Sequence, residues 1–300
     1  MLLEKVIKEY LLECQLQNFT EKTRKGYRNN LELFARYLQE YQQITELEEV
    51  TLSSVKEFVV WQDSKGRKPT YINGQMKTLR AFFTFCQNEG YDYVNMKKIA
   101  WKKEQKVKIK TFRPSDVKKL LGYFTGVDFI NIRNKTILYT LFETGVRCQE
   151  LCDIVPEDIK ENYILIKNGK NHKERVVPLS PVLYKQLVKY IRCREKYIDC
   201  KRHDSQLFLS FHYRQLTVGA VEKMIAGAGK ELGICDVRIS PHTCRHFFAQ
   251  QCVRNGMDIY SLSRLLGHEN ISITQRYLQD LTDEDIVLKA VDKSVIMSIK

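Results

Sequence analysis

Residues 238–278 read RISPHTCRHFFAQQCVRNGMDIYSLSRLLGHENISITQRYL. His242 and Arg245 are three residues apart, so they share a face if this segment is helical. His268 follows a glycine that we expect to end a second helix, and Tyr277 comes nine residues later. We expect a folded helical segment to gather these side chains, including an accessible tyrosine hydroxyl, around one anion.

A zinc site is the first alternative for this stretch, because His242 and His246 are separated by one helical turn. The residue after the first histidine is Thr243, however, where the zinc-protease motif requires a glutamate as general base. The sequence therefore predicts no metal ligands here.

The chain has 300 residues, 43% of them hydrophobic, and a formal net charge of +13. This length suits two domains of ordinary size, and the charge favours a polyanionic partner, with nucleic acid the leading candidate. The nine scattered cysteines are typical of reduced thiols in a cytosol. No signal peptide is recognisable near Met1 and no uncharged run approaches the roughly 20 residues that span a bilayer, so we expect a cytoplasmic protein without a membrane partner.

The first ninety residues predict a small helical bundle. One amphipathic helix follows the N-cap Thr20, and others follow Thr51 and Pro69. Basic residues crowd the first turns of the first helix and the loop 65–68, where they suit contacts to DNA phosphates. The candidate contacts in this region are Lys22, Arg24, Lys25, Arg28, Arg67, Lys68, Lys77 and Arg80.

Residues 96–113 contain many lysines and show no sustained hydrophobic period, which predicts an extended basic linker. Lysines along a linker also suit a phosphate backbone. We therefore add Lys102 and Lys103 to the candidate DNA contacts.

The second half of the chain predicts a mainly α-helical domain with one small antiparallel β-hairpin. Helices are expected from Pro114, over 131–142, 181–194 and 218–232, and through the opening stretch. Period-two runs at 163–166 and 175–179 flank a basic turn, which predicts the hairpin. Residues 282–300 predict a short amphipathic tail helix.

The reactive groups of this half suit phosphate chemistry. Two planar arginine guanidinium groups can donate hydrogen bonds to the oxygens of a phosphate, and a tyrosine hydroxyl can form a covalent phosphodiester link. No Walker glycine loop, acidic metal cluster or Ser-His-Asp set competes with this interpretation.

Five segments of the second half resemble, in order and spacing, the catalytic boxes of the tyrosine recombinases, or phage integrase family. They are Thr144-Gly145-Val146-Arg147-Cys148-Gln149-Glu150-Leu151, Gly169-Lys170-Asn171-His172-Lys173-Glu174-Arg175 leading to Val177-Pro178-Leu179, Pro241-His242-Thr243-Cys244-Arg245-His246, Leu266-Gly267-His268, and Tyr277. The first half is similar to that family's helical core-binding domain in size, charge and position only.

The resemblance implies a covalent mechanism. Tyr277 would attack a scissile DNA phosphate, which gives a 3′-phosphotyrosyl enzyme and a free 5′-hydroxyl. Arg147 and Arg245 would hold the phosphate and stabilise the pentavalent transition state. Lys170 would protonate the departing 5′ oxygen, and Lys173 on the same predicted turn stays an alternative.

Three further residues receive roles from the resemblance. His242 would act as proton acceptor or phosphate ligand, His268 would donate a hydrogen bond to the phosphate, and Glu150 would orient Arg147. The covalent link retains the phosphodiester energy, so neither a metal ion nor a nucleotide cofactor is implied.

The resemblance also implies the domain plan and the partners. Residues 1–95 would form a SAM-like core-binding domain, 96–113 the linker, 114–281 the catalytic domain, and 282–300 a tail that docks on a neighbouring protomer or on its own domain. The partner would be double-stranded DNA with inverted-repeat half-sites, bound by a homotetramer on two duplexes.

Four biological roles are open for a chain with these motifs. The length resembles the Xer dimer resolvases, but Leu278-Gln279 stands where those proteins usually have Thr-His, which favours an integrase or transposase of a mobile element. A type IB topoisomerase shares the chemistry but would have to clamp one duplex. A catalytically silent DNA-binding regulator would tolerate loss of Tyr277 or Arg147, whereas both are present.

Overall fold

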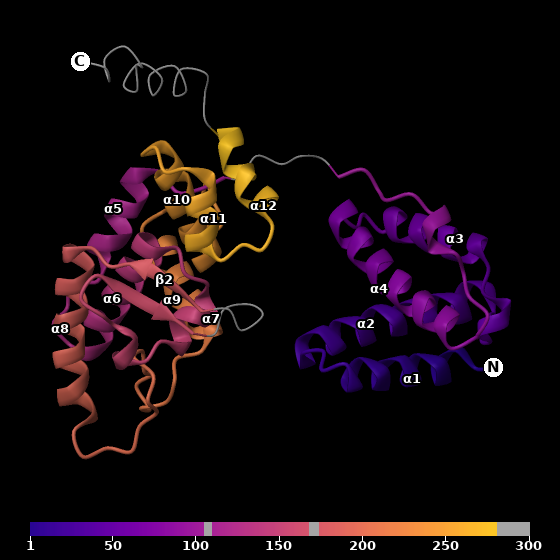
Figure 1. Ribbon diagram of the computed structural model, residues 1–300, viewed down its shortest axis with the longest axis horizontal. Coiled ribbons are helices and arrows are strands. Elements are labelled where there is room, and N and C mark those ends of the chain that lie inside the picture. The colour runs from indigo at the N-terminus through magenta and orange to yellow at the C-terminus, as the bar shows by residue number, and fades with distance from the viewer. Residues whose placement is uncertain (105–109, 168–173, 281–300) are drawn as a thin grey trace, which may run out of the picture. The chain divides into compact units, whose positions relative to one another are not determined.

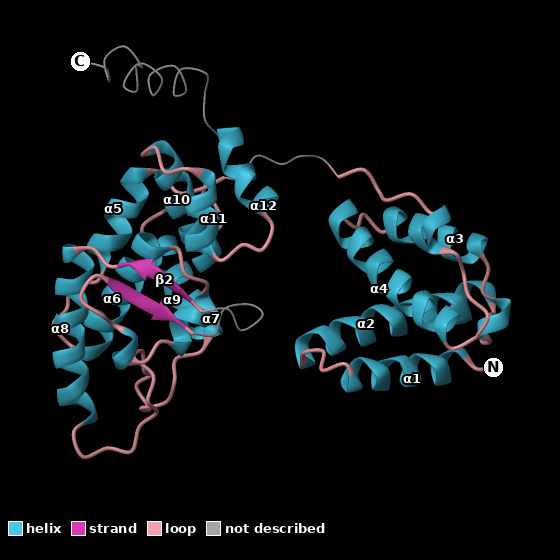
Figure 2. Cartoon of the chain, viewed as in Figure 1, coloured by secondary structure: helices cyan, strands magenta, loops and turns pink. Residues whose placement is uncertain are grey.

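The computed structural model describes residues 1–104, 110–167 and 174–280 of the chain. Two compact units are present, Met1–Lys106 and Val107–Lys300. Both are helical, and the second also contains a two-stranded antiparallel sheet (Figures 1 and 2). The expected fold class is thus confirmed. None of the helices in the described ranges is both long and apolar enough to cross a membrane.

The first unit is a bundle of four helices; the predicted N-cap Thr20 is confirmed, and Thr51, after which a helix was expected, is also an N-cap. The hydroxyl oxygens of Thr20 and Thr51 accept hydrogen bonds from the backbone N–H groups of Thr23 and Ser54, which satisfies donors that have no partner within the helix. The helices are α1 (Leu3–Leu16), α2 (Glu21–Tyr37), α3 (Leu52–Ser64) and α4 (Pro69–Asn88). Aromatic rings including Phe34, Phe58 and Phe83 fill the core between them.

The start of the expected linker differs from the prediction. Met96 and Ile99 are buried in the core of the first unit, and Met96–Lys98 form a short 3-10 helix. Asn73 on α4 holds the next residues, because its side chain donates to the carbonyl of Lys102 and accepts from the Lys102 N–H, both at 2.9 Å. The lysines among these apolar residues interrupt the hydrophobic pattern, so the sequence did not predict that the apolar residues are buried. The expected boundary at residue 95 therefore falls inside the first unit.

The second unit carries the remaining elements, and its hairpin is confirmed. Strands β1 (Tyr163–Ile166) and β2 (Arg175–Pro178) pair antiparallel with Ile166 opposite Arg175. Its helices are α5 (Pro114–Tyr123), α6 (Phe129–Thr144), α7 (Cys148–Asp153), α8 (Pro181–Ile198), α9 (Val218–Glu231), α10 (Pro241–Arg254), α11 (Ile259–Leu266) and α12 (Ile271–Gln275), followed by the 3-10 turn η6 (Arg276–Asp280). The main core lies among α6, α8, α9 and the hairpin, and a smaller cluster joins α10, α11 and η6.

Gly145 ends α6 in the left-handed conformation, with φ of 61°. A Cβ at this position would lie 2.3 Å from Cδ1 of Phe248, so both the dihedral angle and the neighbouring ring require glycine. The carbonyl oxygen of Gly145 also accepts a hydrogen bond from Arg245. The turn between α6 and α7 is therefore fixed against α10.

We predict that Gly145→Ala destabilises the second unit by roughly 2–4 kcal/mol, because it combines backbone strain with overpacking. Urea denaturation measures the effect. Gly227→Ala is the matched control: Gly227 lies within α9, where an added Cβ would meet no atom within 4 Å, so that change should stabilise by about 0.5–1 kcal/mol. Equal stability of Gly145→Ala and the wild type would contradict the prediction.

Candidate active site

The site is built around the C-terminal end of α11. The carbonyl oxygens of its last residues accept hydrogen bonds from three arginines: Leu265 from Arg175 Nε at 2.8 Å, Leu266 from Arg245 Nη2 at 2.6 Å, and Gly267 from Arg147 Nη2 at 3.0 Å. Carbonyl groups in the last turn of a helix have no partner within the helix and carry partial negative charge. Cations from three other segments therefore meet at this point.

Glu150 links two of these arginines. Its carboxylate accepts hydrogen bonds from Arg147 Nη1 at 2.8 Å and from both terminal nitrogens of Arg175, at 2.9 and 2.6 Å. Burial alone would raise the pKa of Glu150, but the hydrogen bonds and charge of Arg175, and then those of Arg147, lower it to about 2. Glu150 is thus ionised and holds the guanidinium of Arg147 by a hydrogen bond.

His268 lies between Arg245 and α12. Its Nε2 is 3.0 Å from Arg245 Nη2, and its Nδ1 is 2.8 Å from the hydroxyl of Thr274. A guanidinium can only donate, so Nε2 accepts and the neutral ring carries its proton on Nδ1. Burial, and then the charges of Arg245 and Arg147, lower the pKa of His268 to about 4.

This arrangement differs from the donor role expected of His268. With Nε2 accepting from Arg245, the ring aligns the arginine and does not itself offer a proton from that nitrogen. Donation to a phosphate would require exchange of this hydrogen bond.

Tyr277 lies on η6 and is 3% exposed, packed in the small cluster with Phe248, Leu262 and Leu266. The sequence suggested an accessible hydroxyl, whereas the structure packs the ring inside. Its Oη is 2.8 Å from Nδ1 of His246 on α10. Tyr277 thus joins the side chains on α10 that were expected near it.

His242 is exposed on the first turn of α10, and its ring meets that of His246 edge to face with centroids 4.2 Å apart. Burial, and then the charge of Arg245, lower the pKa of His242. The expected role of His242 as proton acceptor stays a prediction. Lys170, Lys173 and the tail helix over 282–300 lie outside the described residues, so their roles stay predictions as well.

Two site residues were not identified from the sequence. Arg175 lies in one of the segments that resemble the family's catalytic boxes, but the resemblance implied no role for it. His246 was interpreted only as a possible zinc ligand. The sequence marked Arg175 only as the first residue of a predicted strand, and nothing in it indicated the contact with Glu150. It marked His246 only as the neighbour of Arg245, which places both residues at the same level of α10.

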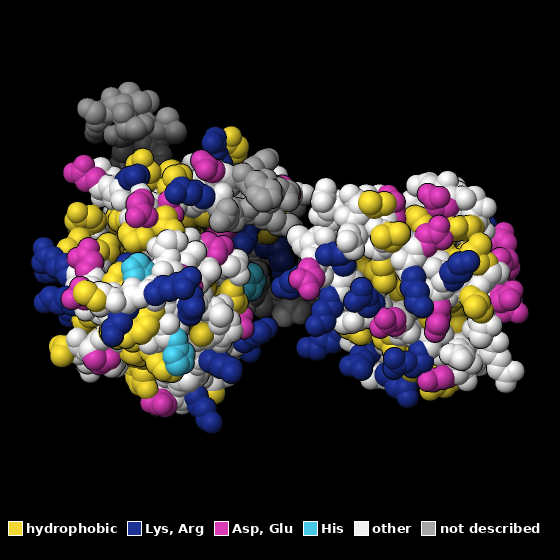
Figure 3. Space-filling view, turned by 90° about the horizontal axis from the view of Figure 1, so that it is seen from below, with side chains coloured by type: hydrophobic (Ala, Val, Ile, Leu, Met, Phe, Trp, Pro, Cys, Tyr) yellow, Lys and Arg dark blue, Asp and Glu magenta, His cyan; other side chains and the backbone are white. Residues whose placement is uncertain are grey.

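The basic residues of the first unit divide into two groups. Lysine and arginine side chains are frequent on the face of this unit that Figure 3 shows. The exposed candidates are Lys22, Lys25, Arg28, Arg67, Lys68, Lys77 and Lys103. Their contacts with DNA stay predictions.

Other candidates are engaged within the unit. Arg80 stacks on Trp101 at 3.9 Å and donates to the Ile99 carbonyl, and Lys102 pairs with Asp63 at 2.8 Å. The predicted DNA contacts of Arg80 and Lys102 are therefore disfavoured, because these side chains already bind their own unit.

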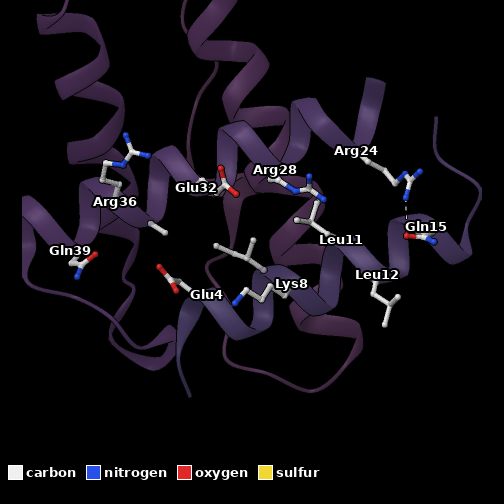
Figure 4. Close-up of a pocket in the computed structure, with 12 residues that line it drawn as sticks. Glu4, Lys8, Leu11, Leu12, Gln15, Arg24, Arg28, Glu32, Arg36 and Gln39 are labelled. Carbon is white, nitrogen blue, oxygen red and sulfur yellow. Dashed lines mark hydrogen bonds between the residues drawn. The ribbon is translucent and has the colours of Figure 1, made fainter. Parts of the chain in front are cut away.

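Arg24 is also engaged, since it donates to Gln15 at 2.9 Å across a hollow of about 670 Å³ between α1 and α2 (Figure 4). Arg28 and Arg36 line the same hollow from α2, with Glu32 between them. The hollow is thus polar and of mixed charge on its α2 side.

The arrangement in the second unit suits an oxyanion and not a metal. Arginines supply bidentate donors to phosphate oxygens, and they are held in place before the ligand arrives. Within residues 1–104, 110–167 and 174–280, no group of three or more His, Cys, Asp and Glu side chains is placed to hold a metal ion.

Comparisons with known proteins agree with this geometry. The sequence model of the Phage integrase family matches residues 110–284, and that of the Phage integrase, N-terminal SAM-like domain matches residues 7–90. Tyrosine recombinase XerD of Listeria monocytogenes serovar 1/2a is 31% identical over 258 residues, 85% of this chain and 86% of the relative. Tyrosine recombinase XerC of Thermodesulfovibrio yellowstonii is 30% identical over 282 residues, 91% and 89% of the two chains.

Solved structures share the fold. The Tn1549 transposon integrase in complex with transposon right end DNA has a TM-score of 0.76 at 18% identity, covering 97% of this chain and 99% of that one. The XerH site-specific recombinase bound to a palindromic difH substrate has a TM-score of 0.75 at 20% identity, covering 98% and 84%. The chain belongs to the phage integrase family. It is a tyrosine recombinase, an enzyme that cleaves and rejoins DNA strands.

We predict that Glu150→Gln destabilises the second unit by about 3–5 kcal/mol at pH 7, because it leaves the largely buried Arg175 and the partly exposed Arg147 without their buried carboxylate partner. The folded-state pKa is lowered from an ordinary value near 4.5 to about 2, so the stabilisation is present above pH 4.5 and is lost as the pH falls towards 2. The stability difference from the wild type, measured by urea denaturation, should narrow below pH 4.5.

Glu157→Gln is the control, since Glu157 is exposed and its change should leave stability nearly unaltered. A difference for Glu150→Gln that does not depend on pH would show that the carboxyl is not ionised in the folded protein.

Proposed function

We propose that this recombinase acts at a specific DNA site through a 3′-phosphotyrosyl intermediate, with Tyr277 as nucleophile. One observation carries the assignment: Arg147, Arg245, His268 and Tyr277 come from separate segments and converge around the end of α11. The set combines an oxyanion clamp with a hydroxyl nucleophile, which is what phosphoryl transfer to a side chain requires.

Each residue takes a role that its contacts support. Arg147 is about one third exposed while Glu150 and Gly267 hold its guanidinium, so it keeps nitrogen surface for a phosphate oxygen. Arg245 is 3% exposed and is held by the carbonyls of Gly145 and Leu266. These arginines bind the scissile phosphate and the transition state, and Lys170 protonates the leaving 5′ oxygen.

We further propose that the recombinase moves a mobile element, acting as a homotetramer on two duplexes with inverted-repeat half-sites. The residues after the nucleophile, Leu278-Gln279, support this role over a Xer resolvase. The 30–31% identity to proteins named XerD and XerC supports the second candidate, resolution of chromosome or plasmid dimers. Sequencing the duplexes that the protein captures covalently from a random pool would identify the half-sites and so separate the two roles.

We predict that Tyr277→Phe abolishes the covalent protein–DNA adduct and leaves DNA affinity nearly unchanged, because only the attacking oxygen is lost. Denaturing gels of reactions with nicked suicide duplexes measure the adduct, and mobility shifts measure binding. Tyr260→Phe is the matched control, since Tyr260 is 63% exposed on α11 and should give wild-type adduct. An adduct that persists in Tyr277→Phe would refute the proposed nucleophile.

The two neighbouring cations on α4 should behave differently. Lys77 is exposed, so Lys77→Ala should weaken binding to all sequences and reduce the slope of log affinity against log salt by about 1. Arg80→Ala should leave the slope unchanged and lower the melting temperature, because Arg80 binds Trp101 and Ile99. Equal salt slopes for Lys77→Ala and the wild type would remove Lys77 from the DNA contacts.

A further inference from the structure

We propose that His246 is the catalytic base that takes the hydroxyl proton of Tyr277. This inference rests on the proposed function, since it concerns the step in which Tyr277 attacks the phosphate. It assigns the step to the histidine that follows Arg245 in the sequence and not to His242.

The contact between the two side chains carries the inference. Nδ1 of His246 lies 2.8 Å from Oη of Tyr277, within the range for a hydrogen bond to a proton that is to be transferred. The ring centroids are 5.6 Å apart with an angle of 58° between planes, so the imidazole points at the hydroxyl and does not stack on the phenol. The geometry required of a base is present before any substrate binds.

Packing holds this geometry. Tyr277 is 3% exposed and His246 is half-buried, and α10 and η6 pack against each other through the cluster that contains Phe248 and Leu266. His242, one helical turn before His246, is exposed and packs edge to face with the His246 ring. A side chain locked by its neighbours loses little entropy when the reaction begins, which favours catalysis.

The surroundings keep His246 in the form that a base needs. Burial, and then His242, Arg276 and Arg245, lower its pKa to about 4, so the ring is neutral near pH 7. Among the described residues, Tyr277 itself and His268, whose pKa is also low, are further titratable groups near His246. A phosphate bound at Arg245 would add negative charge and raise the pKa of His246, so substrate binding would strengthen the base.

The cleavage step exchanges one ester bond of the phosphate for another. Oη of Tyr277 forms a bond to phosphorus, the bond from phosphorus to the 5′ oxygen breaks, and the hydroxyl proton moves to Nδ1 of His246, whose Nε2 already carries a proton. The 5′ oxygen leaves with a proton from Lys170. In the rejoining step the 5′-hydroxyl oxygen attacks phosphorus and passes its proton to the neutral Lys170 amine, while the bond from phosphorus to Oη of Tyr277 breaks and the imidazolium of His246 returns its proton to Oη.

The test compares full-length His246→Asn and His246→Ala with the wild type. Asparagine places an oxygen near the position of Nδ1 and keeps the hydrogen bond but accepts no proton near pH 7, whereas alanine removes both functions. His212→Asn is the matched control, since His212 is exposed in the same unit and should react at the wild-type rate. Melting temperature and DNA affinity are measured for each protein.

The substrate is a nicked suicide duplex of the covalently captured sequence, made with either oxygen or sulfur at the 5′ bridging position. A thiolate leaves without protonation, so sulfur should restore cleavage by Lys170→Ala but not by the His246 variants. We expect both His246 variants to form adduct about 100-fold or more slowly on either duplex. Added imidazole should partly restore His246→Ala, which keeps the test decisive if the asparagine variant does not fold.

The pH profile supplies a second measurement. The rate on the sulfur duplex should rise with pH in the wild type as His246 loses its proton, and this titration should be missing in His246→Asn. Wild-type rates in His246→Asn would overturn the inference, because they would reduce His246 to a hydrogen-bonding role. Failure of the wild type to capture any duplex covalently would instead refute the proposed function.

Discussion

At the end of α11, the carbonyl oxygens of Leu265, Leu266 and Gly267 each accept a hydrogen bond from a different arginine. The arginines come from a strand, a helix and the turn before α7, so this one helix terminus ties together segments up to 120 residues apart in the chain. Last-turn carbonyls attract cations through their partial negative charge. The placement of the three arginines therefore depends on where α11 ends, and Gly267 sets that end by its left-handed conformation.

The three arginines need these contacts with negative groups because they carry like charges. Three guanidinium groups repel one another, and Glu150 supplies one full negative charge against them. The peptide dipoles at the end of α11 supply further stabilisation without adding an acid that would repel DNA. A site built this way holds its cations in place and still presents net positive charge to a phosphate, which is the arrangement that lowers reorganisation during phosphoryl transfer.

Sequence patterns predicted those parts of the fold that depend on a single residue or on a short run of residues. Thr20 caps a helix, Gly267 ends one, and period-two runs form the hairpin, all as the sequence indicated. Of the site residues recognised by family boxes, Arg147, Arg245, His268 and Tyr277 lie close together in the second unit, whereas Lys170 lies outside the described residues. Contacts between distant segments were not predictable, because no local pattern reveals that His246 meets the Tyr277 hydroxyl or that Arg175 meets Glu150. Burial of Met96 was missed because lysines surround it.

The crowding of cations around Arg245 also affects the protein when it is away from DNA. Burial and the neighbouring Arg147 lower the pKa of Arg245 to about 10, which shows that its charge is held at a cost to the folded state. In the proposed complex, a DNA phosphate at the site would relieve this cost and would bind only the folded unit. By mass action, the population of folded protein would then rise with the concentration of its DNA. The same guanidinium groups would thus couple the fraction of folded enzyme to the presence of its substrate.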